Sequence, residues 1–308
     1  MDDIPFVDAH IHLWNLQRIR YPWLTPPFGD NGPNGSVAAI AHDFTVADYR
    51  AQAARWNMVG AVHVDAGAEP AQALDETRWL EAVADAEQLP TAIVAFAALE
   101  DLNVGQMLAA QAAHQRVRGI RQIVNWHPDA RRSYQPRDLT RSAGWQAGFA
   151  RLAHHGLSFD LQCYPGQMPA LAALVARHVD VPVIINHLGM PVLADPYGLE
   201  EWRTGLRAMA ALPHVAIKLS GLGFVARDWS DALVRPLLAE AIDLFGPERC
   251  LIASDTPTDT LFAPFERCLG VLADATASFS RDERRAMWGG NADRLYRLGL
   301  GLRRDAAT

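Results

Sequence analysis

Cysteine is scarce in this chain of 308 residues: there are three, and no two form a C-x-x-C pair. Cys163, Cys250 and Cys268 are too few and too widely spaced for a disulfide scaffold or a cysteine-rich zinc site. The chain also lacks any apolar run approaching the roughly 20 residues of a membrane helix. Residues 1–5 are acidic and lack the pattern of a secretory leader. We therefore expect a cytoplasmic protein without a membrane partner.

Positive charge is in the minority, with 28 Lys and Arg against 35 Asp and Glu, which gives a net charge of −7. A surface for nucleic acid needs clustered Lys and Arg, so we expect no nucleic-acid partner and disfavour a nuclease. No G-x-G-x-x-G follows the first apolar segment, which argues against a dinucleotide site. Because half of the residues are hydrophobic, the chain can bury a large core. We expect one domain over residues 1–308.

Eight short apolar segments alternate with helix-like segments along the chain. The predicted strands are residues 6–14, 58–66, 91–99, 117–124, 157–164, 182–189, 215–222 and 250–257. Helical spacing marks residues 74–88, 105–114, 168–178, 201–212 and 232–245 between them. Eight βαβ-type repeats in roughly 250 residues match the size of a (β/α)8 TIM barrel. We predict this α/β fold; a doubly wound open sheet is the alternative.

Two of the connections are long. Residues 15–43, after the first strand, are rich in Pro and Gly, and residues 125–144, after the fourth, include Trp126 and several arginines. Long loops in compact domains are usually functional. Barrel enzymes place their chemistry where the strands end. We expect both loops to border an active site.

Polar residues gather on one face of the first strand. Asp8, His10 and His12 alternate with apolar residues, so strict alternation predicts that all three point the same way. Two imidazoles on one face can converge on a metal ion or on a polarised carbonyl group. This pair is the first indication of a site.

Other predicted strands also carry polar residues near their ends. These are His63 and Asp65, Arg121 and Asn125, Asp160, Gln162 and Tyr164, His187, Lys218 and Ser220, and Asp255. Buried ionisable groups cost several kcal/mol unless they are paired or bound to a ligand. We therefore predict a shared polar pocket at one end of the barrel.

Several of these residues allow two interpretations. Asp255 suits a general base or a metal ligand, but could also cap a helix. Lys218 is either a substrate contact or the ion-pair partner of a lumen carboxylate. Arg121 suits a polarised carbonyl or a substrate carboxylate. Trp14 and Trp126 directly follow strand ends and are candidates for lining the pocket.

The motifs D-A-H-I-H-L-W at 8–14, N-H-L-G-M-P at 186–191, K-L-S-G-L at 218–222 and A-S-D-T-P at 253–257 resemble the amidohydrolase superfamily. Together with G-G-N-A-D-R-L-Y at 289–296, they are similar to its lactonase-rich amidohydrolase 2 branch. The resemblance implies a distorted barrel that hydrolyses sugar-acid lactones, 2-pyrone dicarboxylate or muconolactone-type compounds. It makes His10, His12 and His187 ligands of a metal or of a carbonyl, and Asp255 the base that activates water.

The chain departs from the binuclear members of that superfamily. Arg121 stands where they have a bridging Lys or Glu, and the fifth strand offers Tyr164 and no histidine. The resemblance therefore implies at most one divalent metal, Zn²⁺ or Mn²⁺, held by His10, His12, His187 and Asp255, and leaves metal-free catalysis open. Thr256, His63 and Asp65 also differ from the residues usual in the branch. We therefore expect a substrate different from those of the best-known members of the branch.

We predict that Asp255 activates a water that attacks a lactone carbonyl. His187, Arg121 and Tyr164 are predicted to polarise the carbonyl and to stabilise the negative charge that develops on its oxygen. The predicted substrate contacts are His63, Asp65, Trp14, Trp126 and Lys218. A metal-dependent decarboxylase or hydratase of a carboxylic acid is the alternative, and a non-catalytic barrel is disfavoured. Arg131, Arg132 and Arg137 would suit a dicarboxylate lactone, whereas the aromatic residues suit a sugar lactone. The sequence leaves a homo-oligomer open.

Overall fold

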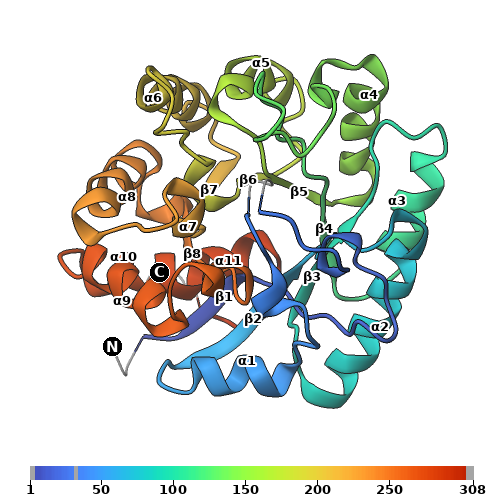
Figure 1. Ribbon diagram of the computed structural model, residues 1–308, viewed down its shortest axis with the longest axis horizontal. Helices are drawn as coiled ribbons and strands as arrows, with labels where there is room; N and C mark the ends of the chain where they lie inside the picture. Colours follow the sequence, from blue (N-terminus) through green and yellow to red (C-terminus); the bar gives the residue numbers. More distant parts are fainter. Residues whose placement is uncertain (1–3, 31–33, 303–308) are drawn as a thin grey trace, which may run out of the picture.

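A computed structural model describes residues 4–30 and 34–302. Eight parallel strands follow one another around a barrel in chain order, and the helices surround them (Figure 1). The strands are β1 (Phe6–Ile11), β2 (Met58–Val64), β3 (Ala92–Phe96), β4 (Val117–Arg121), β5 (Ser158–Leu161), β6 (Val183–Ile185), β7 (Val215–Leu219) and β8 (Cys250–Ile252). The prediction of a (β/α)8 barrel is confirmed.

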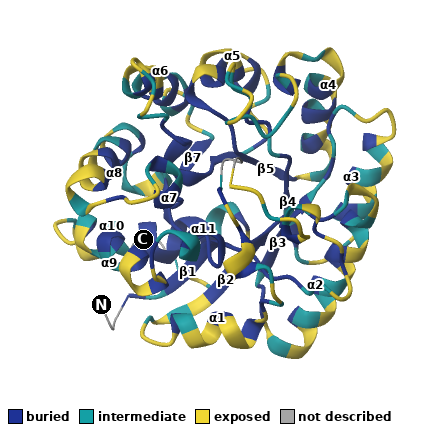
Figure 2. Cartoon of the chain, in the orientation of Figure 1, coloured by how far each residue is buried: buried dark blue, intermediate teal, exposed yellow. Residues whose placement is uncertain are grey.

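Helices connect consecutive strands as far as β8, three more follow β8 within the described residues, and together they form the outer layer. They are α1 (Val46–Ala53), α2 (Ala73–Glu87), α3 (Val104–Ala112), α4 (Ala143–Arg151), α5 (Met168–Val175), α6 (Gly198–Ala210), α7 (Leu222–Val225), α8 (Asp231–Phe245), α9 (Phe265–Ala275), α10 (Arg281–Arg285) and α11 (Asn291–Leu295). Figure 2 shows the strands mostly buried, while the helices expose their outward faces to solvent. No helix of the described residues is long and apolar enough to cross a membrane.

The barrel closes beyond the end of β8. The backbone N–H of Asp255 donates to the carbonyl of His10 at 2.9 Å, and the N–H of His12 donates to the carbonyl of Thr256 at 2.8 Å. These bonds continue the ladder between β1 and the segment that follows β8. They also bring Asp255 next to both histidines of the first strand.

Apart from the buried ion pair between Lys218 and Asp160, the inside of the barrel is apolar below the level of the site. Val62 and Val64 of β2, Val94 of β3 and Leu251 of β8 form a cluster there with Tyr296, which follows α11. Because the residues that alternate with these pack against the helices, inward and outward faces can be assigned strand by strand. Polar groups therefore concentrate at the end where the strands finish.

A register shift in β1 separates Asp8 from the two histidines. The pairing with β2 slips between Asp8 and Ile11, as in a β-bulge. The Asp8 carboxylate accepts hydrogen bonds from the Tyr49 hydroxyl of α1 at 3.2 Å and from the Ser254 N–H at 2.9 Å. The prediction that Asp8, His10 and His12 share one face is therefore wrong for Asp8.

The strands are shorter than predicted, so several polar residues lie in loops. Tyr164, His187 and Asp255 all come after the last residue of their strands. The long loops after β1 and β4 occupy residues 12–45 and 122–142 and contain short 3₁₀ turns at Pro22–Leu24, Ala38–Ile40 and Leu139–Arg141. Residues 31–33 of the first loop lie outside the described residues.

Candidate active site

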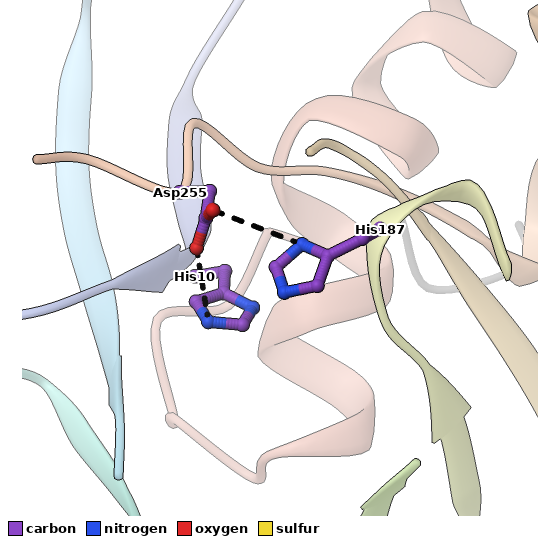
Figure 3. Close-up of side chains that lie close together, drawn as sticks. All are labelled: His10, His187 and Asp255. Atoms are coloured by element: carbon purple, nitrogen blue, oxygen red, sulfur yellow. Dashed lines mark ion pairs between the residues drawn. The ribbon is translucent and has the colours of Figure 1, made fainter. Parts of the chain in front are cut away.

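Asp255 is the meeting point of three histidines. Its Oδ1 atom lies 3.3 Å from Nε2 of His10 and 3.3 Å from Nε2 of His12, and its Oδ2 lies 3.9 Å from Nδ1 of His187. Figure 3 shows His10 and His187 converging on this carboxylate from different elements. All four side chains are buried. The sequence predicted these four residues as a group, and the structure brings them together.

The backbone is strained at two of these four residues. Asp255 has φ 56° and His187 has φ 53°, in the left-handed region that residues other than glycine rarely occupy. At His187 this conformation has a clear effect. Val183 and Ile185 of β6 face the helices, so plain alternation would send His187 outward as well. The left-handed turn instead directs its ring toward Asp255, and strain of this kind is concentrated at functional sites.

Hydrogen bonds distinguish the two histidines of the first strand. Nδ1 of His12 lies 2.8 Å from the carbonyl oxygen of Val64, which can only accept, so Nδ1 carries the proton. Nε2 of His12 therefore turns a lone pair toward Asp255. His10 differs, because its Nδ1 lies 3.5 Å from the ammonium group of Lys218.

Lys218 is the only lysine in the chain and is fully buried beneath His10. It forms an ion pair with Asp160, whose carboxylate also accepts a hydrogen bond from the Tyr296 hydroxyl at 2.9 Å. Lys218 does not line the cavity described below. The geometry matches the ion-pair interpretation of Lys218 and gives it no direct contact with a substrate.

Burial sets the protonation of the cluster. It lowers the pKa of His12 to about 3 and the pKa values of His10 and His187 well below their usual range, with the nearby cations adding to the effect. Burial also raises the pKa of Asp255, against the opposing influence of Arg121 and Lys218. Near neutral pH the three imidazoles are uncharged, and the carboxyl group holds its proton more tightly than an exposed one.

A cavity of about 200 Å³ opens beside this cluster. His12, Arg121, His187 and Asp255 supply one part of its wall. The remainder comes from the loops and strand ends, namely Trp23, Asn34, Ala66, Gly67, Ile123, Tyr134, Gln162, Phe224 and Thr258. The cavity thus combines a charged end with amide, hydroxyl and aromatic groups.

Arg121 lines the cavity, and its guanidinium group is fixed by contacts with Gln162 and Asp65. One terminal nitrogen donates to Oε1 of Gln162 at 3.0 Å, and the other donates to the backbone carbonyl of Asp65. Nε of Arg121 lies 3.5 Å from Oδ2 of Asp65. Asp65, predicted as a substrate contact, therefore orients Arg121 and does not line the cavity itself.

Tyr164 and His63 do not reach the cavity. The Tyr164 hydroxyl donates to the carbonyl of Arg132 at 2.7 Å and borders a neighbouring hollow. His63 lies between inward-facing Val62 and Val64, and its Nδ1 accepts the N–H of Leu13 at 3.1 Å. Their predicted roles at the oxyanion and at the substrate do not agree with these positions.

The predicted tryptophans are likewise displaced from the cavity. Trp14 is buried, donates to the carbonyl of His42 at 2.6 Å and packs 5.6 Å from the ring of Trp23, which lines the cavity in its place. Trp126 is half-buried outside the lining. Tyr134, which sequence reasoning placed only in a loop, lines the cavity and donates to Oδ1 of Asn34 at 2.8 Å.

Glu76 of α2 is a buried carboxyl that sequence reasoning missed. It is 2% exposed and accepts the N–H of Ala66, next to Asp65. Burial, reinforced by the charge of Asp65, raises the pKa of Glu76. The position of Glu76 on an amphipathic helix does not indicate a role in the site. Only the fold brings its carboxyl group next to Asp65, the residue that orients Arg121.

Glu76→Gln should remove a pH dependence of stability. As pH rises above the usual glutamate pKa, the unfolded chain loses this proton while the folded protein retains it. The wild type therefore loses stability relative to Glu76→Gln by about 1.4 kcal/mol per pH unit between about pH 5 and pH 7. Urea unfolding at several pH values measures this difference. Glu87→Gln, at a half-buried position on the same helix, is the control. Parallel curves for wild type and Glu76→Gln would contradict the assignment.

The donor set suits one divalent metal ion. Atoms of His10, His187 and Asp255 lie within 4.8 Å of one another. Nε2 of His10 and both carboxylate oxygens of Asp255 have no hydrogen-bond partner among the described residues. Two imidazoles and a carboxylate are typical zinc ligands. Lys218 disfavours metal binding at this site. A metal ion bound to Nε2 of His10 requires the ring proton to be on Nδ1, and that N–H would then point at the ammonium group of Lys218.

Removal of the Lys218 charge should therefore tighten metal binding. We expect the Lys218→Met/Asp160→Asn double variant to bind Zn²⁺ about tenfold more tightly than the wild type, measured by competition with a chromophoric chelator. Asp160→Asn alone keeps the ammonium group and is the matched control. Equal zinc affinity in the two variants would show that Lys218 has no influence on the site.

The fold and this cluster define a class of protein: a (β/α)8 barrel hydrolase-type scaffold with a His-His-Asp site where its strands end. The amidohydrolase family model matches residues 7–298, and the chain belongs to this family.

Two curated relatives and one solved structure illustrate the match. The chain is 38% identical over 300 residues to the uncharacterized protein y4mH of Sinorhizobium fredii, covering 97% of this chain and 100% of that one. It is 31% identical over 307 residues to an L-fucono-1,5-lactonase of Burkholderia multivorans, covering 95% and 96%. A crystal structure of an amidohydrolase from Burkholderia multivorans with bound zinc superposes with a TM-score of 0.79 at 28% identity, over 95% of this chain and 99% of the other.

Proposed function

We propose that this protein opens the ring of a sugar-acid lactone by hydrolysis. The observation that carries the proposal is the buried Asp255 carboxylate, set among three uncharged imidazoles and facing a cavity that also presents Arg121. Attack of water on an ester carbonyl requires a base to take a proton from the water and a fixed positive charge near the carbonyl oxygen, and this cavity contains both. The L-fucono-1,5-lactonase from Burkholderia multivorans, similar along the whole chain, supports a lactone as the substrate.

Asp255 takes a proton from water, and the resulting hydroxide forms a bond to the lactone carbonyl carbon. The raised pKa of Asp255 suits this task, because a general base works best when its pKa is near the working pH. Arg121 stabilises the negative oxygen of the tetrahedral intermediate, a contribution of roughly 3–4 kcal/mol for a well-placed donor. When the ring C–O bond breaks, protonated Asp255 returns the proton to the leaving alkoxide. A zinc ion held by His10, His187 and Asp255 would add Lewis acidity.

The cavity lining favours a hydroxylated ring over a dicarboxylate. Asn34, Gln162 and Thr258 offer amide and hydroxyl groups, and Trp23 offers an aromatic face for a sugar ring. Two of the three arginines that would suit a dicarboxylate are engaged elsewhere: Arg131 pairs with Asp129 at 2.8 Å, and Arg132 with Asp195 at 2.6 Å.

A pH-indicator assay of a lactone panel tests the proposal. The panel contains hexono-1,5-lactones, 2-pyrone-4,6-dicarboxylate and a simple aliphatic lactone, each with and without a chelator. We expect enzyme-dependent acid release with the sugar lactones and little with the dicarboxylate. A preference for the dicarboxylate would overturn the substrate class, and no acid release from any lactone would overturn the function.

A further inference from the structure

A second hollow of about 280 Å³ adjoins the active-site cavity. Tyr134 and Phe224 line both spaces, so these two side chains form the boundary between them. The outer hollow lies between the loop after β4, the loop after β6 and the end of α7. Phe224 links it directly to the catalytic group, because its ring lies 5.0 Å from the ring of His187.

The surface of this hollow is mostly apolar. Met190, Pro191, Val192 and Leu193 line one side, and Val225 and Ala226 line another. Four polar side chains also line it: the Tyr164 hydroxyl donates to the Arg132 carbonyl, the Arg132 guanidinium pairs with Asp195, the Tyr134 hydroxyl donates to Asn34, and Arg227 adds a second guanidinium. A ligand there would gain mainly from burial of its own apolar surface.

Contacts between the two loops hold the hollow open in a defined shape. Asp195, in the loop after β6, binds two residues of the loop after β4: Nε2 of His127 at 2.9 Å and the guanidinium of Arg132 at 2.6 Å. Nδ1 of His127 accepts the N–H of Asp129 at 3.0 Å, which leaves the proton on Nε2 for Asp195. The hollow is therefore a preformed space, as ligand sites usually are.

We propose that the outer hollow is a second substrate subsite, which takes an apolar aryl or alkyl substituent of a lactone whose ring occupies the inner cavity. This inference rests on the proposed function. The inner cavity has room for about one ring, whereas pockets for larger ligands measure about 300–1,000 Å³. The two spaces together reach that size, and because Phe224 lines both of them, a molecule that extends from Asp255 past Phe224 would occupy both. The substrate class is thus a lactone with an apolar extension.

A matched pair of lactones tests the subsite: D-glucono-1,5-lactone and its 6-O-benzyl ether. We expect the wild type to hydrolyse the benzyl ether with a kcat/KM at least about tenfold higher. Leu193→Trp, which fills the outer hollow, should remove this preference and leave kcat/KM for the parent lactone within about twofold. Leu102→Trp is the control, because Leu102 is fully exposed beside α3, away from both spaces.

The outcomes separate the two proposals. If the parent is hydrolysed but the benzyl ether is no better, or if Leu193→Trp affects both lactones equally, the subsite is wrong and the lactonase proposal stands. If neither lactone is hydrolysed, the lactonase proposal fails. Calorimetry with 6-O-benzyl-gluconate then decides the subsite alone: binding weakened at least tenfold by Leu193→Trp supports it, and equal binding or no binding overturns it.

Discussion

Asp255→Asn is expected to lower kcat for lactone hydrolysis by about a thousandfold or more, without loss of the fold. The amide cannot take a proton from water, and general-base catalysis is typically worth 10²–10⁴-fold. Asparagine matches aspartate in size and removes a buried carboxyl whose ionised form is costly, as its raised pKa indicates. The thermal midpoint should therefore equal or exceed that of the wild type.

The control for this variant is Asp228→Asn, an exposed carboxyl in the loop after α7. It should retain wild-type kcat and stability. If Asp255→Asn kept more than about a tenth of wild-type kcat, the base would have to be another group. If it lost activity only together with its unfolding transition, the result would report stability and not chemistry.

Gly221→Ala is expected to cost about a hundredfold in kcat/KM, although Gly221 touches no substrate. A Cβ at this position would lie 2.5 Å from Cβ of His187 and 2.7 Å from its Nδ1. The ring of His187 must move to make room, and a displacement of about 1 Å in a catalytic site can reduce the rate 10²-fold. Asp259 fixes this turn by accepting the N–H groups of Leu222 and Gly223.

Gly156→Ala separates this clash from backbone strain. Gly156 has φ 60°, close to the 67° of Gly221, but a Cβ there would meet no atom within 4 Å. Gly156→Ala should cost about 1–2 kcal/mol of stability for a left-handed alanine, and Gly221→Ala should cost more because of the contact with His187. Only Gly221→Ala should also lose activity. Equal activity in the two variants would show that the position of His187 is not critical.

The barrel could be predicted because its signal is repeated eight times along the chain. Each strand is a short apolar segment, and errors of a few residues at its ends do not change the topology. His10, His12, His187 and Asp255 were also predictable as a group, because they stand at the ends of three strands, β1, β6 and β8. In a parallel barrel these ends lie on one side.

The remainder of the site depends on departures from regular geometry. The bulge in β1 turns Asp8 toward α1, and the inward side of β2 carries Val62 and Val64 in place of His63. A prediction from strict alternation assumes that β1 has no bulge and that the polar residues of β2 face inward. Tyr134 enters the cavity through a contact with Asn34, a hundred residues away, which no local pattern encodes. Tyr164 was misplaced because the strand before it ends at Leu161.

The central claim is that Asp255 directs water to a lactone carbonyl carbon. Hydrolysis of a hexono-1,5-lactone in ¹⁸O-labelled water, followed by mass spectrometry of the open acid, tests it most directly. The predicted result is enzyme-dependent ring opening with one label in the carboxylate group, no release of carbon dioxide, and little more of this product from Asp255→Asn than forms without enzyme. Label in the alcohol, release of carbon dioxide, or formation of the labelled acid by Asp255→Asn at the wild-type rate would contradict the claim.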